Sequence, residues 1–178
     1  TLAPPPASDM PAPPPSPAVA PTATAVPPAP AASQAVPTAP AGQMTVQVFL
    51  IAVGDNGQSG KLTGCGDSAV PVRVTIAATE GVLRAALNEL LSVEGQYYGE
   101  SGLYNALYQS DLRVEDVAIK AGTAVIELSG SLMLGGECDG PRVVAQIEET
   151  ARQFSTVQAV TVFVNGEPLQ ACLLYTSP

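Results

Sequence analysis

The segment CDGPRVVAQIEETARQFSTVQAVTVFVNG (138–166) decides the fold, because it contains a helix, a strand and a tight turn in succession. A helix is predicted over 138–154, with Asp139 as its N-cap and Pro141 in its first turn. Its apolar stripe consists of Val143, Val144, Ile147, Ala151 and Phe154. The β-branched run VQAVTVFV (157–164) predicts a strand, and Asn165-Gly166 predicts a turn into a further short strand.

The rest of the chain adds a second helix and more strands. TEGVLRAALNELLS (79–92) predicts an amphipathic helix with Thr79 as its N-cap, and GLYNALYQ (102–109) predicts a short one. Alternating apolar residues predict strands over 44–53 and 69–77, and a hairpin over 112–131 with its turn at Ala121-Gly122. We therefore expect an α+β fold in which two helices pack on one face of a mixed β-sheet.

The N-terminal residues 1–43 have a different composition. They contain fourteen of the eighteen prolines, no aromatic residue and a single charged residue, Asp9. Such a segment has too little apolar surface to offset the entropy of ordering it, so we expect a disordered, extended Pro/Ala-rich linker. The remaining residues, 44–171, are enough for one domain.

Both ends of the chain are unusual. The final residues CLLYTSP (172–178) resemble one translated reading frame of a transposase sequencing adaptor, so we expect the native sequence to be interrupted near Ala171. Since the chain begins with Thr1 and lacks a signal peptide, we also expect a fragment whose N-terminal signal or lipoprotein anchor is missing. With Cys172 assigned to the adaptor-like residues, the native cysteines are Cys65 and Cys138.

Charge and composition exclude several functions. The formal net charge is −9 and no Lys/Arg cluster is present, which excludes nucleic acid as a partner. No apolar run approaches the roughly 20 residues of a transmembrane segment. Because the chain has no histidine, a Ser-His-Asp triad is impossible and a zinc site lacks its usual ligands. We expect no enzyme activity, catalytic residue, metal or cofactor.

The two cysteines lie in GCGDS (64–68) and GGECDGP (135–141). A cysteine nucleophile would need a neighbouring base and an electropositive setting, and neither is visible. A disulfide between Cys65 and Cys138 fits an exported chain, while two free buried thiols remain the alternative.

Tyrosines concentrate in one short segment. Tyr97, Tyr98, Tyr104 and Tyr108 lie beside Glu100 and Asn105, and Tyr104 and Tyr108 share a face if the segment is helical. Exposed tyrosines with polar neighbours suit protein contacts or stacking on sugars, so these six residues are a candidate binding surface. The alternative is a lid over the core with its hydroxyl groups at the rim.

Several segments together resemble the GerMN domain, the sporulation and spore germination domain. They are VQVFLIA, LRAALNELLS, SGLYNALYQSDLRVEDVAIKAGTAVIELSG and VAQIEETARQFSTVQAVTVFVNGEPL, and the resemblance covers about 46–169. It implies an extracytoplasmic bacterial domain, often on a lipoprotein or wall-associated protein, with a fold similar to ring-building motifs. It supplies no catalytic residues. The two cysteine segments are absent from the general pattern and indicate a subgroup with an added cysteine pair.

Two functional hypotheses follow. The first is a non-enzymatic domain of the bacterial cell envelope that contacts another envelope protein, in spore-associated or other envelope assembly. The alternative is a module that binds cell-wall glycan or peptidoglycan through the tyrosine-rich segment.

Overall fold

The computed structural model describes residues 42–175. The predicted linker, apart from its last two residues, and the last three residues of the chain lie outside this range. The elements are β1 (Gln43–Ala52), β2 (Lys61–Leu62), the 3₁₀ turn η1 (Gly64–Gly66), β3 (Ser68–Ala77), α1 (Val82–Leu91), β4 (Asp111–Lys120), β5 (Thr123–Ser131), α2 (Asp139–Arg152), β6 (Ala159–Val164), β7 (Glu167–Pro168) and α3 (Leu169–Tyr175).

The first sheet has the strand order β1-β3-β2. β1 and β3 pair antiparallel over their full length, from Gln43 opposite Ala77 to Ala52 opposite Ser68. The short β2 pairs with only the first two residues of β3. Alternate residues of β1 are buried, as its sequence predicts for a strand with one face on the core.

The second sheet has the order β4-β5-β6-β7. β5 and β6 are parallel because α2 forms the crossover between them, whereas the other pairs are antiparallel. Both predicted tight turns are present: Ala121-Gly122 joins β4 to β5 and Asn165-Gly166 joins β6 to β7, with positive φ at all four residues.

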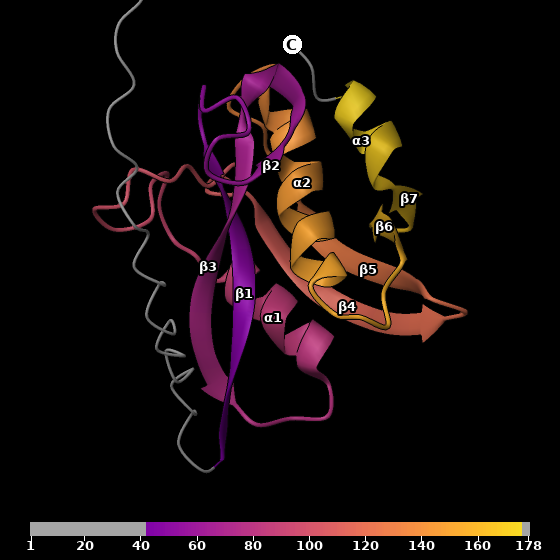
Figure 1. Ribbon diagram of the computed structural model, residues 1–178. Helices are drawn as coiled ribbons and strands as arrows, with labels where there is room; N and C mark the ends of the chain where they lie inside the picture. Colours follow the sequence, from indigo (N-terminus) through magenta and orange to yellow (C-terminus); the bar gives the residue numbers. More distant parts are fainter. Residues whose placement is uncertain (1–41, 176–178) are drawn as a thin grey trace, which may run out of the picture. The chain divides into compact units, whose positions relative to one another are not determined.

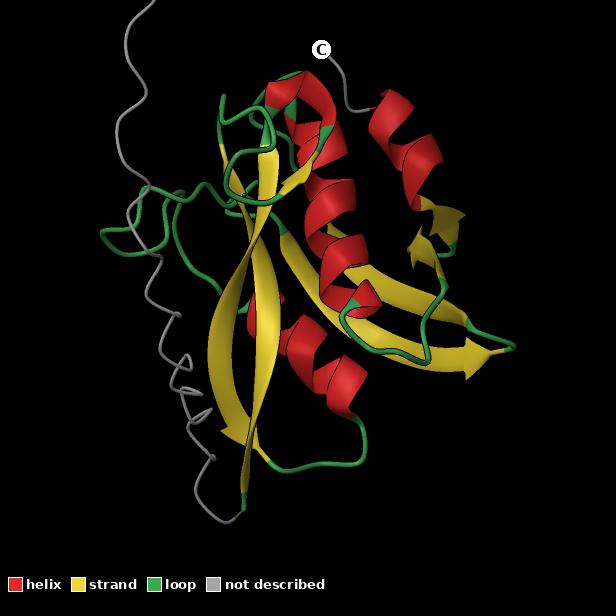
Figure 2. Cartoon of the chain, viewed as in Figure 1, coloured by secondary structure: helices red, strands yellow, loops and turns green. Residues whose placement is uncertain are grey.

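Helices α1 and α2 carry the predicted apolar stripes into a common core. Leu87 and Leu90 of α1 and Val143 and Ile147 of α2 are buried together with residues from both sheets. The α+β class is confirmed, and Figure 2 shows the helices among the strands. The strands form two sheets, however, and not the single sheet expected.

The division into two sheets has a local cause at β1. Its outer edge is occupied by α2 side chains: the Gln47 amide donates to Gln153 Oε1 (2.7 Å) and the Phe49 amide donates to Thr150 Oγ1 (3.1 Å). Those backbone groups are therefore not open to a strand of the second sheet.

Three local predictions need correction. α1 has Gly81 as its N-cap, and the Thr79 hydroxyl, two residues earlier, accepts a hydrogen bond from the Gly81 amide. The segment 102–109 forms turns and not a helix, because the Asn105 side chain bonds nearby backbone groups. α2 has Cys138 as its N-cap, and the Asp139 carboxylate instead accepts a hydrogen bond from Arg142.

The C-terminal helix α3 was not predicted. It continues into the adaptor-like residues, and Cys172 and Leu173 lie half-buried against the core. The proposed native boundary near Ala171 stays a prediction.

Candidate functional site

A disulfide joins Cys65 in η1 to Cys138 at the start of α2, with their Cα atoms 6.0 Å apart. The predicted cysteine pairing is therefore present. The bond fixes the glycine-rich loop after β1 to the N-terminus of α2, across a sequence separation of 73 residues.

A buried ion network lies next to the disulfide. Arg142 of α2 bonds the Asp67 carboxylate (Nε to Oδ2, 2.7 Å) and the Asp139 carboxylate (Nη1 to Oδ1, 3.1 Å). Both aspartates are only 1% exposed. The Gly54 amide donates to Asp67 and the Gly135 amide donates to Asp139, so the carboxylates have further partners. Such satisfied buried charges fix the relative positions of the segments that carry them.

Tyr104 extends this network toward the tyrosine-rich segment. Its hydroxyl donates to Asp139 Oδ2 (2.9 Å), and the Arg142 guanidinium lies 5.1 Å from the centre of its ring. Burial, and then the bond to the Asp139 carboxylate, raise the pKa of Tyr104 well above its usual value. Burial alone would lower the pKa of Arg142, but its bonds to Asp67 and Asp139 raise it. Tyr104 is therefore a neutral donor and Arg142 a fixed cation.

The other tyrosines of this segment are more exposed than Tyr104. Tyr97 and Tyr108 each contact its ring edge-to-face, at centroid distances of 5.9 and 6.1 Å. Tyr108 is half-buried, whereas Tyr97 is 56% exposed and Tyr98 36% exposed. The segment thus has a buried anchor and two exposed rings.

Backbone bonds hold the tyrosine-rich segment against β1. The Ile51 amide donates to the Tyr104 carbonyl (2.9 Å), and the Tyr104 amide donates back to Ile51 (2.7 Å). Within the segment, the Tyr98 amide donates to the Leu103 carbonyl and the Asn105 amide to the Gln96 carbonyl. The exposed rings are therefore carried by a loop with regular backbone pairing.

Asn105, predicted as a surface residue, is fully buried. Its side chain donates to the Val93 carbonyl and accepts from the Leu107 amide and from Gln146 of α2. Tyr104 is 7% exposed. Of the six predicted contact residues, these two lie in the core because their polar groups find partners there. Glu100 is exposed, so Tyr97, Tyr98, Glu100 and the half-buried Tyr108 remain candidates.

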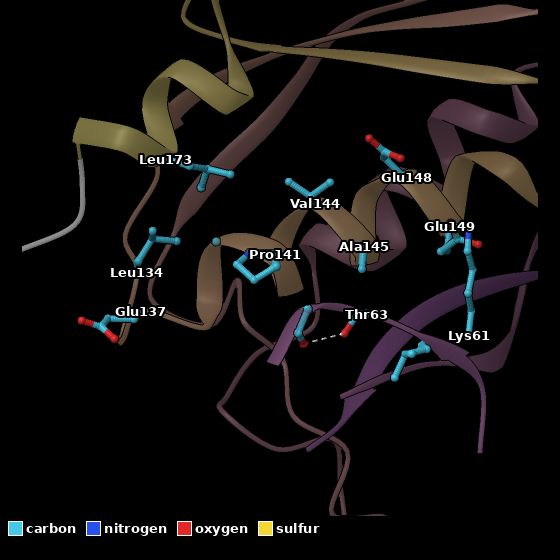
Figure 3. A pocket seen from close by; sticks show the side chains of 13 residues that line it. Lys61, Thr63, Leu134, Glu137, Pro141, Val144, Ala145, Glu148, Glu149 and Leu173 are labelled. Atoms are coloured by element: carbon cyan, nitrogen blue, oxygen red, sulfur yellow. Dashed lines mark hydrogen bonds and ion pairs between the residues drawn. The ribbon is translucent and has the colours of Figure 1, made fainter. Parts of the chain in front are cut away.

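A hollow of about 440 Å³ lies away from this segment, between β2 and α2 (Figure 3). Pro141, Val144 and Ala145 form its apolar floor, and Lys61 pairs with Glu149 at its rim (2.6 Å). One wall includes Leu173 of α3.

Residues 42–175 hold no group of three or more His, Cys, Asp or Glu side chains placed to bind a metal ion. Over the same residues, no helix has the length and apolarity to span a membrane.

Sequence reasoning missed Asp67, Arg142 and Gln146. Asp67 and Asp139 lie within the two cysteine segments, 64–68 and 135–141, which was the available signal. Nothing in the sequence marks Gln146 as buried, because it lies between Val143 and Ile147 on a helix with many polar residues.

The fold defines a disulfide-linked α+β domain, and comparison with known proteins gives its family. The family model Germane, described as sporulation and spore germination, matches residues 51–170. The chain belongs to this family.

Two solved structures share the fold. The tandem GerMN domains of the sporulation protein GerM from Bacillus subtilis are similar with a TM-score of 0.53 and 21% identity, over 75% of this chain and 43% of that one. The first GerMN domain of GerM is similar with a TM-score of 0.50 and 21% identity, over 71% of this chain and 86% of that one. The chain thus spans less than half of the tandem-domain structure. Among curated proteins, none matches significantly.

Proposed function

We propose that this protein is a non-enzymatic, extracytoplasmic domain that binds another protein of the bacterial cell envelope through Tyr97 and Tyr98. The observation that carries the proposal is the pair of exposed rings on one loop, of which Tyr97 packs edge-to-face on Tyr104, the buried tyrosine that bonds Asp139 beside Arg142. A ring that is already fixed loses little entropy on binding, which is why tyrosines anchor many protein interfaces.

The disulfide supports the extracytoplasmic location. Disulfides such as Cys65–Cys138 form and persist in exported proteins and are rare in the cytosol. The family description and the similarity to GerM come from sporulation, so the envelope assembly that we propose is spore-associated or closely related.

The test is the affinity of the full chain for a partner enriched from envelope extract of the source bacterium. An interface tyrosine that is a true hot spot contributes about 2 kcal/mol or more to binding. Tyr97→Ala and Tyr98→Ala should therefore each raise the dissociation constant roughly thirtyfold. Tyr98→Ala should not lower the melting temperature appreciably, since its ring is 36% exposed and has no ring contact with Tyr104. Tyr97→Ala also removes the edge-to-face contact with Tyr104 and should cost about 0.5–1.5 kcal/mol of stability. Ile119→Ala, at a residue 44% exposed on β4, is the matched control and should bind normally.

Two results would contradict the proposal. Unchanged affinity in both tyrosine variants would place the contact elsewhere. Displacement of the partner by soluble muropeptide would favour a glycan-binding module.

A further inference from the structure

The outer edge of β3 has no strand beside it over most of its length. β1 pairs with one side of β3 throughout, but on the other side β2 pairs only with Ser68 and Ala69. Across residues 42–175, no other segment bonds to that side from Pro71 to Ala77 (Figure 1). An edge of this kind is a template for an added strand.

The register identifies the groups that point outward. Gln47 and Phe49 of β1 direct their backbone groups away from β3, toward α2. Their opposite residues, Arg73 and Pro71, therefore direct theirs away from β1, and Thr75 follows by alternation. The amide and carbonyl groups of Arg73 and Thr75 form no hydrogen bond with any described residue on this side.

The outward backbone groups of β1 and β3 differ in whether they have hydrogen-bond partners. On β1, side chains of α2 satisfy the outer backbone groups, as described above. On the outer edge of β3 from Pro71 to Ala77, one backbone donor is missing at Pro71, since proline has no amide to donate. An unsatisfied row thus remains over Arg73–Ala77.

A groove runs beside this row, between β3 and α1. Two hollows of about 390 and 330 Å³ share Glu89 as a lining residue. Ile76 and Ala85 line the first, and Val74 and Tyr98 line the second. An extended peptide on the edge would place every second side chain into these hollows, as in other complexes formed by strand addition.

The charge of the groove indicates the chemistry of the occupant. Glu89 and Glu94 line the end next to Tyr98, and neither carboxylate has an ion-pair partner among the described residues. The Arg84 guanidinium at the other end is already bound by carbonyls of β4 and by Asp116. A basic side chain therefore complements the Tyr98 end.

A second copy of this chain fits less well. The formal charge of −9 disfavours self-association, and pairing of two β3 edges would bring the acidic grooves of both copies together.

The geometry points to strand addition: an extended segment of the partner, with small apolar residues at alternate positions and a Lys or Arg near Glu89 and Glu94, pairs with Arg73 and Thr75 of β3. This inference rests on the proposed function and names the form of the partner. Tyr98 lies at the end of the groove, so the same partner can contact the exposed tyrosines.

A synthetic peptide that alternates valine and threonine, with a lysine at each end, is the probe. Binding to the isotope-labelled full chain should shift the amide signals of Arg73 and Thr75 and slow their hydrogen exchange. A twin peptide with N-methyl groups on the amides facing β3 should bind at least about tenfold more weakly, because it loses backbone bonds. A twin with glutamates in place of the lysines should also bind more weakly, and Glu89→Gln with Glu94→Gln should remove that difference.

Variants of the edge itself provide a second arm. Thr75→Pro removes one outward amide, as Pro71 already does four residues earlier, and should weaken peptide binding at least about tenfold. Thr75→Val keeps the amide and should bind normally. The peptide arms do not depend on whether Thr75→Pro folds.

Four outcomes would overturn the inference. They are unaffected Arg73 and Thr75 signals at millimolar peptide, equal binding of the N-methylated twin, protection of both amides in the free chain at all concentrations, and protection that grows with protein concentration. The third outcome would mean that another segment of this chain occupies the edge, and the fourth that a second copy does. Because envelope-partner binding is measured separately with Tyr97→Ala and Tyr98→Ala, the edge can fail while the proposed function holds.

Discussion

Replacing Arg142 by methionine should destabilise the domain by about 3 kcal/mol. The arginine side chain is 15% exposed, and it compensates Asp67 and Asp139, whose side chains are 1% exposed. Removing one member of a buried ion network costs about 3–5 kcal/mol, because the remaining charge stays buried without compensation. The lower end applies here, since Asp67 keeps a backbone amide and Asp139 keeps the Tyr104 hydroxyl.

Urea and thermal unfolding with the disulfide intact measure this loss. Against a typical stability of 5–15 kcal/mol, a loss of about 3 kcal/mol should lower the melting temperature by about 10 °C. Arg152→Met is the matched control on the same helix, because Arg152 is 36% exposed and pairs with Glu148 at the surface. It should cost less than about 1 kcal/mol. Equal losses in the two variants would refute the role given to the buried network.

Three further predictions test the site. Cys65→Ser with Cys138→Ser should lower the free energy of unfolding by up to about 4 kcal/mol, measured by urea titration, because the bond restricts a long loop of the unfolded chain; an unchanged value would contradict this. The pKa of Tyr104 is raised in the folded protein, so its contribution to stability is complete below the unfolded-state pKa near 10 and is lost as the pH rises above that pKa. Above pH 10, the free energy of unfolding should therefore fall more steeply in the wild type than in Tyr104→Phe. Parallel curves for the two proteins would count against a raised Tyr104 pKa. Asn105→Ala should destabilise by about 3 kcal/mol in the same assay, because it leaves buried partners unpaired, and a neutral effect would argue for a surface role.

Much of the fold could be predicted from the sequence. The helical spacing of Leu83, Leu87 and Leu90 located α1, and Asn165-Gly166 located the last hairpin, because both signals depend on near neighbours in the chain. The division into two sheets could not be predicted in this way. Alternation identifies a strand but not its partner, and here Thr150 and Gln153 of a distant helix occupy the edge of β1.

The candidate site was also predicted only in part, because its contacts join residues that are far apart in the sequence. The clustering of tyrosines directed attention to the correct segment, but composition does not distinguish the exposed Tyr97 from the buried Tyr104. That difference comes from Asp139, which lies 35 residues further along the chain. Arg142 resembles a solvated helix residue until its partner Asp67, 75 residues away, is placed beside it.

Photo-crosslinking tests the central claim, that Tyr97 and Tyr98 form the contact surface for an envelope protein, most directly. A photoreactive amino acid replaces Tyr98 in the full chain, and a control chain carries it at Met133, which is 50% exposed in the segment after β5. We predict that the first chain forms one discrete protein adduct in envelope extract, that excess unlabelled chain abolishes it, and that muropeptide does not. Equal adducts at both positions, or an adduct at position 98 that muropeptide displaces, would contradict the claim.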